Sequence, residues 1–282
     1  MSVHSSSVSS YTPDEMMTVA AARLIQPGCV CFVGIGVPSA AANLARLTHA
    51  PDMVLIYESG AIGTHPRVLP LSIGDGELAE TATAVVSLPE IFSYWLQAGR
   101  IDLGFLGAAQ IDRFGNLNTT VIGGYAKPKT RLPGAGGAPE IALHAKQIFV
   151  VLKQSPRSFV AKLDFCTSAG FLNGHGERAR RAIAGAGPQV VITDLGVFKP
   201  AADSQELTLV ARYENVSVDK IRQATGWPLA IADIIDVVAP PTADELRVLR
   251  DLHKRTDIAH AGDARRFRKT PRPSLGQARS IA

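Results

Sequence analysis

Short, continuous apolar runs alternate with segments of helical periodicity along the chain. The runs do not alternate polar and apolar residues, as strands with one exposed face would. Uninterrupted apolar strands are typical of a parallel sheet that helices bury on both faces. The pattern therefore predicts an α/β fold with a mostly parallel sheet covered by helices. The predicted strands span residues 29–33, 53–57, 101–107, 147–153 and 189–198.

The first helix carries clear signals at both ends. Thr12 suits the N-cap, Pro13 suits the first helical position, and Glu15 completes a capping box with Thr12. Pro27 and Gly28 follow the periodic segment and predict its end. A second helix is predicted over residues 38–48.

Composition describes an ordinary globular chain. Its 282 residues are 46% hydrophobic and 19% charged, which is enough apolar material for a sizeable core. No run reaches the roughly 18 apolar residues of a membrane span, and the first residues lack the basic and apolar regions of a signal peptide. We expect a cytoplasmic protein with no membrane contact, whose residues 1–262 form one domain.

The net charge of +4 is concentrated at the C-terminal end. Residues 263–282 hold six basic residues and one acid, a net +5, which leaves −1 for the remaining 262 residues. We therefore expect residues 263–282 to be a flexible basic tail. The rest of the chain lacks the electrostatic footprint of a nucleic-acid-binding protein.

Glycine-rich segments lie next to several predicted strands. Gly34 and Gly36 follow the first strand, Glu58 follows the second within "YESGAIG", and Gly136 and Gly137 belong to a "GAGG" segment. Functional loops gather at the carboxyl ends of parallel strands, so the first two segments predict one site. A dinucleotide site is a weak alternative, because the third glycine of its fingerprint is replaced by Ser39.

Two interpretations of Glu58 are equally supported by the residues alone. The carboxylate could cap the following turn by accepting hydrogen bonds from the amides of residues 60 and 61. Alternatively, an ionised glutamate can attack an activated acyl group without a general base. Gly60 and Gly63 are expected to let the chain turn away and leave room for a bulky ligand.

Five segments together carry a resemblance to a known family. The chain resembles the B subunit of the family I coenzyme A transferases through most of residues 12–195. The segments are "GIGVPSAAANLARL", "IYESGAIG", "LSIGDGELAE", "WLQAGRIDLGFLGAAQIDRFGNLNTTVIG" and "RLPGAGGAPEIA".

The resemblance implies a ping-pong transfer of CoA through a thioester on Glu58. It implies succinyl-CoA as the donor and 3-oxoadipate as the acceptor. No metal or other cofactor is expected, because coenzyme A itself is the substrate and the covalent intermediate. It also implies that backbone amides of Gly34 and Gly36 approach the reacting carbonyl, with Gly136 and Gly137 as second candidates.

Other expectations concern binding residues and partners. Lys127, Lys129 and Arg131 are candidate cations for substrate carboxylates or CoA phosphates. The resemblance covers one half of a two-part enzyme, so it implies an A subunit that completes the active site in a heterodimer or heterotetramer. A glutaconate-type transferase, a CoA-thioester hydrolase on the same fold and a non-catalytic partner subunit remain alternatives.

Overall fold

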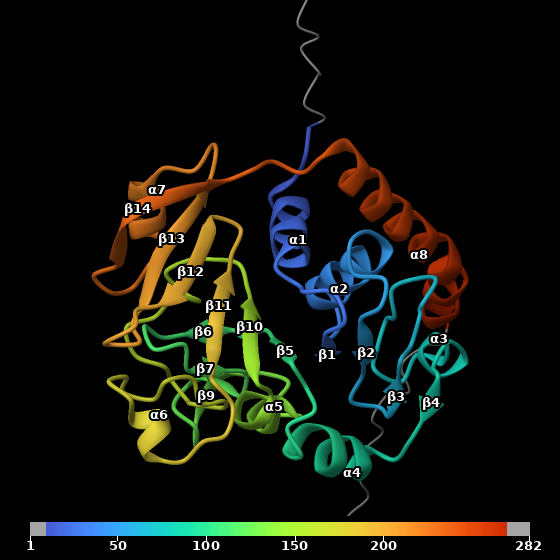
Figure 1. Cartoon of the computed structure of the whole chain (residues 1–282), viewed down its shortest axis with the longest axis horizontal. Coiled ribbons are helices and arrows are strands. Elements are labelled where there is room, and N and C mark those ends of the chain that lie inside the picture. Colours follow the sequence, from blue (N-terminus) through green and yellow to red (C-terminus); the bar gives the residue numbers. More distant parts are fainter. Residues whose placement is uncertain (1–9, 270–282) are drawn as a thin grey trace, which may run out of the picture.

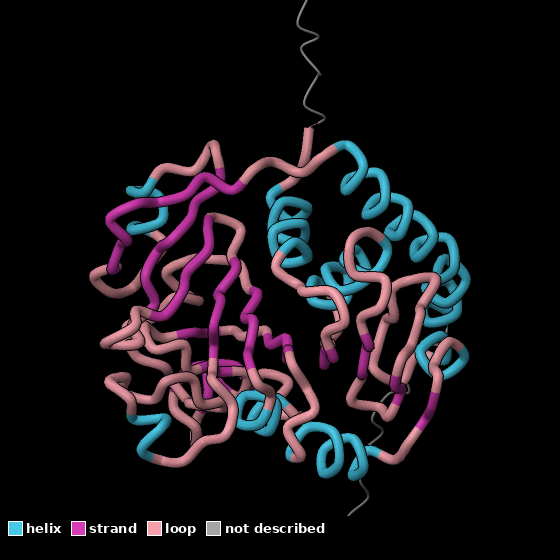
Figure 2. Tube along the Cα trace, viewed as in Figure 1, coloured by secondary structure: helices cyan, strands magenta, loops and turns pink. Residues whose placement is uncertain are grey.

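A ten-stranded sheet runs through the computed structural model (Figures 1 and 2), which describes residues 10–269 and the side chains of residues 10–261. Its order is β14-β13-β12-β11-β10-β5-β1-β2-β3-β4. In chain order these strands are β1 (Val30–Phe32), β2 (Val54–Ile56), β3 (Ala61–Ile62), β4 (Ala84–Val85), β5 (Leu103–Leu106), β10 (Gln147–Val151), β11 (Pro188–Ile192), β12 (Gly196–Pro200), β13 (Leu207–Tyr213) and β14 (Ala230–Val238). Two small sheets pair β6 (Gln110–Ile111) with β7 (Leu117–Asn118), and β8 (Val121–Gly123) with β9 (Pro128–Arg131).

Several helices lie against this sheet, with α1, α2 and α8 close together in Figure 1 and α6 and α7 placed apart from them. The group formed by α1, α2 and α8 packs together, and α5 packs against β5 and η1. The helices are α1 (Pro13–Arg23), α2 (Val37–Leu47), α3 (Gly76–Glu80), α4 (Leu88–Glu90), α5 (Ala138–His144), α6 (Glu177–Arg180), α7 (Val218–Gln223) and α8 (Ala243–Lys269), with a π-helix, η1 (Ile91–Gln97).

The prediction of a mostly parallel sheet covered by helices is confirmed. In the ten-stranded sheet, β11, β10, β5, β1 and β2 pair in parallel, and so do β13 and β14 at one edge. The antiparallel pairs of this sheet, as far as the chain is described, lie on either side of its parallel centre. Apolar residues of the central strands are buried as expected, with Leu55 and Val150 fully enclosed. Because parallel neighbours share one direction, the carboxyl ends of β1, β2, β5 and β10 meet at one edge.

The predicted start of the first helix is also confirmed. The amide of Glu15 donates to Thr12 Oγ1 at 3.1 Å, and the amide of Thr12 donates to Glu15 Oε2 at 2.8 Å. These reciprocal bonds form the capping box that the spacing predicts. The helix ends at Arg23, four residues before Pro27.

One predicted strand is wrong. Residues 189–198 form parts of two antiparallel strands, β11 and β12, with a tight turn between them. The hydroxyl of Thr193 accepts hydrogen bonds from the amides of Leu195 and Gly196, both at 3.0 Å. The turn has the sequence "TDLG", whose polar residues and glycine favour reversal of the chain. The prediction missed it because apolar residues lie on both sides and suggest one continuous strand.

Helix α8 passes the domain boundary that the sequence predicts at residue 262. It continues to Lys269 and so includes residues 263–269 of the predicted tail. Residues 270–282, the rest of that segment, lie outside the described residues. Within the part that is described, no helix combines the length and apolar character needed to cross a bilayer.

An ion pair ties the start of α8 to the end of α1. Arg23 Nε and Nη2 donate to the two carboxylate oxygens of Glu245 at 2.7 and 2.6 Å. Arg23 also donates to the carbonyls of Ala239 and Pro240, which join β14 to α8. Burial would raise the pKa of Glu245, but hydrogen bonds from Arg23 and Thr242 outweigh it and lower the pKa below its ordinary value of 4.5.

The first prediction concerns this pair. Because the folded-state pKa of Glu245 lies below the unfolded-state value, its carboxylate contributes stability above about pH 4.5 that is lost as the pH falls through the folded pKa. Glu245→Gln should lower the free energy of unfolding by about 1 kcal/mol at pH 7, with a smaller difference below pH 4.5. Urea titrations across this pH range measure both effects.

The matched control is Asp244→Asn. Asp244 pairs with Arg247 while both side chains are 70% exposed, so this change should leave stability within about 0.5 kcal/mol. A loss at Glu245 that is equally large at pH 3 would show that the pair contributes through something other than its charge.

Candidate functional site

Glu58 lies in a tight turn between β2 and β3. The amide of Gly60 donates to the carbonyl of Tyr57, and the amide of Tyr57 donates to the carbonyl of Ala61, both at 3.0 Å. The capping interpretation requires the Gly60 amide to donate to the Glu58 carboxylate. The structure shows no such bond, because this amide donates to the carbonyl of Tyr57 instead. Among the described residues, the Glu58 side chain has no hydrogen-bond partner, which leaves both carboxylate oxygens available to a ligand.

Tyr57 fixes the base of this turn. Its side chain is fully buried, and its hydroxyl lies 2.8 Å from Ser39 Oγ of α2. Burial raises the pKa of Tyr57 to about 12, so the phenol stays neutral at physiological pH. The residue before Glu58 is thus held by packing and by a hydrogen bond to a neighbouring helix.

Two glycines of the turn are needed for close packing. Gly60 has φ +108°, and a Cβ on it would lie 2.0 Å from the carbonyl oxygen of Val86. Gly63 has φ +61°, and a Cβ there would lie 2.7 Å from Thr83 Oγ1. The space that these glycines leave is therefore occupied by residues 83–86, which corrects the expectation that they make room for a ligand.

A cleft of about 490 Å³ brings Glu58 together with three of the four predicted glycines. Gly34 comes from the end of β1, and Gly136 and Gly137 come from the segment before α5. None of the three amides donates to an acceptor within the described residues. These N–H groups can therefore hydrogen-bond a ligand oxygen in the cleft.

Gly137 lies against the Glu58 carboxyl group. A Cβ on Gly137 would be 3.3 Å from Glu58 Cδ and 2.5 Å from Cζ of Phe92, which belongs to η1. Glycine thus permits an aromatic ring and the carboxyl group to approach the same backbone position. Phe92 does not line the cleft itself but packs behind Gly137, and the sequence did not predict this contact because "IFSYWLQ" is typical of an ordinary apolar segment.

Gly36 lies outside the Glu58 cleft. It is the N-cap of α2, with φ +84°, and lines a neighbouring cavity of about 700 Å³ between α1, α2 and α8. Gly34 and Gly36 therefore do not face the same cleft, although only Ile35 separates them. The left-handed backbone at Gly36 turns the chain from the end of β1 into α2.

The predicted cations are also placed elsewhere. Lys127, Lys129 and Arg131 lie in or beside β9, and none of them lines the cleft. Arg131 donates to the carbonyl of Tyr125 at 2.9 Å and stacks over that ring, with 4.7 Å between Cζ and the ring centroid. These three residues thus belong to the β8–β9 hairpin, whereas Gly136 and Gly137, which follow in sequence, line the cleft.

Lys153 is the cation that does line the cleft. It follows β10, whose carboxyl end lies at the same edge as that of β2, and it forms an ion pair with Asp14 of α1 at 3.0 Å. Its signal in the sequence is its place as the first charged residue after the apolar run "IFVVL". It was not among the predicted site residues.

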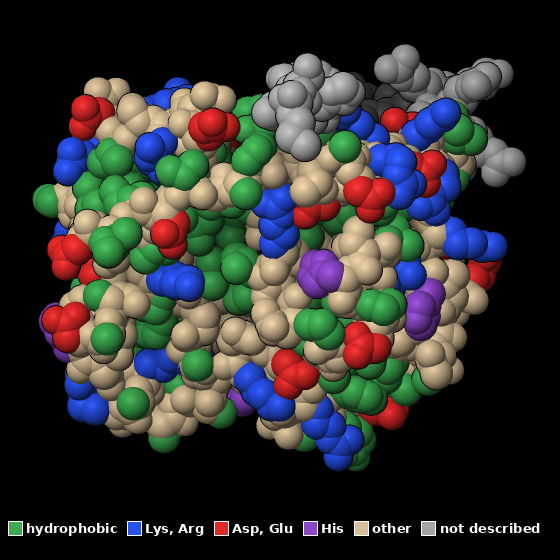
Figure 3. Space-filling view, turned by 45° about the horizontal axis from the view of Figure 1, so that its top comes forward, with side chains coloured by type: hydrophobic (Ala, Val, Ile, Leu, Met, Phe, Trp, Pro, Cys, Tyr) green, Lys and Arg blue, Asp and Glu red, His purple; other side chains and the backbone are tan. Residues whose placement is uncertain are grey.

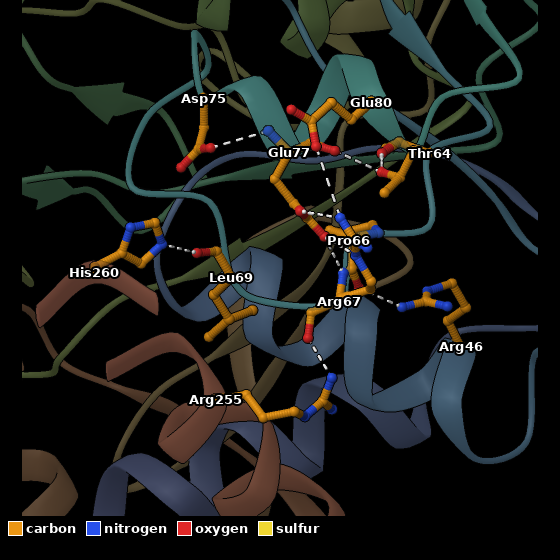
Figure 4. A network of polar contacts seen from close by, with 11 residues as sticks. Arg46, Thr64, Pro66, Arg67, Leu69, Asp75, Glu77, Glu80, Arg255 and His260 are labelled. Atoms are coloured by element: carbon orange, nitrogen blue, oxygen red, sulfur yellow. Dashed lines mark hydrogen bonds and ion pairs between the residues drawn. The ribbon is translucent and has the colours of Figure 1, made fainter. Parts of the chain in front are cut away.

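A polar network fixes residues 64–80 (Figure 4). This segment contains Ile73, which lines the cleft. Arg67 pairs with Glu77 of α3 at 3.2 Å. The carbonyl of Leu69 lies 3.3 Å from His260 Nε2 of α8, and the carbonyl of Pro66 accepts from an arginine of α2 at 2.9 Å. Residues 64–80 are thereby tied to both α2 and α8.

Charged side chains of both signs are interspersed over the face in Figure 3, apart from the residues drawn in grey. On this face the described residues form no continuous stripe of lysine and arginine, the feature that a phosphate backbone would bind.

Comparison with known proteins identifies a family. The profile described as "Coenzyme A transferase" matches residues 14–224. The chain is 58% identical over 253 residues to the B subunit of 3-oxoadipate CoA-transferase from Pseudomonas knackmussii, covering 90% of this chain and 97% of that protein. It is 37% identical over 241 residues to the B subunit of glutaconate CoA-transferase from Acidaminococcus fermentans, covering 83% and 89%.

Solved structures agree with this result. The crystal structure of glutaconate coenzyme A-transferase from Acidaminococcus fermentans superposes with a TM-score of 0.82 at 32% identity, covering 93% of this chain and 98% of that chain. The decarboxylase AibA/AibB superposes with a TM-score of 0.74 at 26% identity, covering 87% and 96%.

The second prediction tests the packing of the Glu58 turn. Gly60→Ala should lower the free energy of unfolding by about 3 kcal/mol or more, because the new Cβ meets backbone atoms at a strained φ. Gly34→Ala is the matched control, since its Cβ would meet nothing within 4 Å. Urea denaturation compares the two, and equal stability of both variants would contradict the tight packing of residues 60 and 86.

Proposed function

Because the chain belongs to the coenzyme A transferase family, we propose that it is the B subunit of an enzyme that moves CoA from succinyl-CoA to 3-oxoadipate. Glu58 is the nucleophile in this proposal. The acceptor is taken from the name of the relative that is 58% identical over nearly its whole length. The 37% identical relative acts, by its name, on glutaconate, which is also a dicarboxylic acid.

The arrangement around Glu58 is the observation that carries the proposal. A carboxylate without a hydrogen-bond partner among the described residues shares a cleft with three amides that lack an acceptor there. Acyl transfer to a carboxylate needs a nucleophile of this type and donors for the oxyanion that develops on the carbonyl. One such donor can contribute about 2.7–4 kcal/mol to transition-state stabilisation.

The first half-reaction loads the enzyme. A Glu58 oxygen attacks the thioester carbon of succinyl-CoA, the C–S bond breaks, and a glutamyl-succinyl anhydride and a CoA thiolate form. The thiolate then attacks the Glu58 carbonyl carbon of the anhydride. Succinate leaves with the bridging oxygen, and Glu58 becomes a CoA thioester.

The second half-reaction reverses these steps with another acid. A carboxylate oxygen of 3-oxoadipate attacks the Glu58 thioester, and CoA leaves as its thiolate. The thiolate attacks the 3-oxoadipyl carbonyl carbon of the new anhydride, which releases 3-oxoadipyl-CoA and the Glu58 carboxylate. The amides of Gly34, Gly136 and Gly137 are the donors available to the oxyanions of these steps.

An A subunit completes the site in this proposal. Both transferase relatives are B subunits by name, and the structural neighbour AibA/AibB has two named components. Large apolar side chains are exposed along the segment that supplies Phe92 and Ile73, which favours a partner that covers it. They are Leu71, Ile73, Val85, Leu88 and Tyr94.

The third prediction concerns the covalent intermediate. The chain combined with its A subunit and treated with succinyl-CoA, without acceptor, should carry CoA on the Glu58 peptide in mass spectrometry. Glu58→Gln should carry none and should lose at least about a thousandfold in transfer rate, because an amide is a poor nucleophile. Its near-identical shape should preserve the unfolding midpoint.

The control is Glu214→Gln, at an exposed glutamate that does not line the cleft. This variant should form the adduct and transfer CoA at the parent rate. Turnover by Glu58→Gln at the parent rate would contradict the nucleophile assignment. Rapid discharge of the wild-type adduct by water alone would favour a thioester hydrolase instead.

A further inference from the structure

We propose that Lys153 binds the distal carboxylate of the dicarboxylic substrates, the one that does not react, within the Glu58 cleft. This inference rests on the proposed function, because it concerns how that site selects its acids. It names a binding subsite on this chain, in addition to whatever the A subunit contributes.

The charges that line the cleft support this assignment. Among the described residues that line the cleft, only Glu58 and Lys153 are charged, and the others are apolar side chains or glycines. Both succinyl-CoA and 3-oxoadipate carry a free carboxylate besides the reacting carbonyl group. A carboxylate that enters a largely apolar cleft needs a cationic partner, because leaving an ion unpaired after desolvation is costly.

The spacing of the strands suits such a substrate. Glu58 follows β2 and Lys153 follows β10, with β1 and β5 between them in the sheet. Adjacent strands lie about 4.8 Å apart, so these two strands are about 14 Å apart. An extended six-carbon diacid spans roughly 6 Å between its carboxyl carbons, given five C–C bonds of about 1.5 Å. The diacid is therefore shorter than the distance between the two strands. The side chains of Glu58 and Lys153 can extend over the remaining distance.

Asp14 shows how Lys153 can hold a carboxylate. Lys153 Nζ lies 3.0 Å from one oxygen of Asp14 and 3.1 Å from the other. Its hydrogen bond with Asp14 raises the pKa of Lys153, as a carboxylate partner of an ammonium is expected to do. Both side chains are largely exposed, at 66% and 57%, and ion pairs of this kind contribute little to stability. A substrate carboxylate can therefore replace Asp14 at small cost.

One cation at this position would serve both half-reactions. In a ping-pong sequence the donor acid leaves before the acceptor acid enters, so both distal carboxylates use the same cleft in turn. Between these events Asp14 keeps the ammonium paired. The other candidate cations, Lys127, Lys129 and Arg131, do not line this cleft.

The fourth prediction compares two acceptors that differ only in the distal carboxylate. The complex with the A subunit is loaded with succinyl-CoA, freed of excess donor, and mixed with 3-oxoadipate or with 3-oxohexanoate. Mass spectrometry follows the loss of the Glu58 thioester. Lys153→Met should slow discharge by subsaturating 3-oxoadipate by about tenfold or more, and should change discharge by 3-oxohexanoate by less than about twofold.

Two variants serve as controls. Asp14→Asn removes the internal carboxylate but keeps the lysine, so its preference for 3-oxoadipate should equal or exceed that of the parent. Lys146→Met removes a lysine that pairs with Asp102 outside the cleft, and should leave both rates unchanged. Unchanged 3-oxoadipate discharge in Lys153→Met would overturn the proposal, and so would an equal loss with both acceptors.

Calorimetry of 3-oxoadipate binding to the unloaded complex separates this inference from the proposed function. The Kd for 3-oxoadipate should rise about tenfold in Lys153→Met. If the wild type forms no thioester, the covalent mechanism fails, while a higher Kd in the variant still supports the subsite. If the thioester forms and the Kd is unchanged, the proposed function stands and the subsite is overturned.

Discussion

The site depends on the way the chain leaves the sheet after β2. Tyr57 is fully enclosed and its hydroxyl meets Ser39 of α2, while the next three residues reverse direction into β3. Gly60 lies so close to Val86 that no side chain fits between them. With both sides of the turn fixed, Glu58 is held at the cleft without using its own carboxylate as a structural hydrogen-bond acceptor.

The parallel centre of the sheet then gathers the other groups. Gly34 and Lys153 follow strands whose carboxyl ends lie at the same edge as that of β2, and Gly137 approaches the Glu58 carboxyl from the start of α5. Together with Glu58 they line a cleft whose other described residues are apolar side chains or glycines, and the Lys153 ammonium is paired with Asp14 of α1. Electrostatic interactions with a bound acyl group are stronger in such surroundings than in water.

Features that depend on neighbouring residues in the sequence, such as helix caps and apolar strands, could be predicted. The capping box of Thr12 and Glu15 involves residues only three positions apart, and its prediction was confirmed. Each apolar run predicts a buried strand from its own residues, and the central strands were confirmed in this way. Glu58 and Gly34 follow predicted strands, but the roles expected for Glu58, Gly34, Gly136 and Gly137 came from the family resemblance, and the structure brings these four residues to one cleft. The turn at Thr193 was missed because apolar residues flank it on both sides.

The remaining site residues depend on tertiary structure. Lys127, Lys129 and Arg131 precede the glycine segment in sequence, but the β8–β9 hairpin takes them elsewhere, and Lys153 reaches the cleft from β10 instead. Gly36 is separated from Gly34 by one residue, yet the turn into α2 directs it to another cavity. Phe92 meets Gly137 only through the packing of η1 against α5.

The most direct test of Glu58 as the nucleophile is to follow oxygen atoms through turnover. With 3-oxoadipate labelled with ¹⁸O in its carboxyl groups, the anhydride mechanism passes one labelled oxygen to the Glu58 carboxylate and then, in the next cycle, to succinate. Mass spectrometry of the Glu58 peptide and of released succinate should detect the label in both. Turnover that leaves Glu58 and succinate unlabelled would contradict the mechanism.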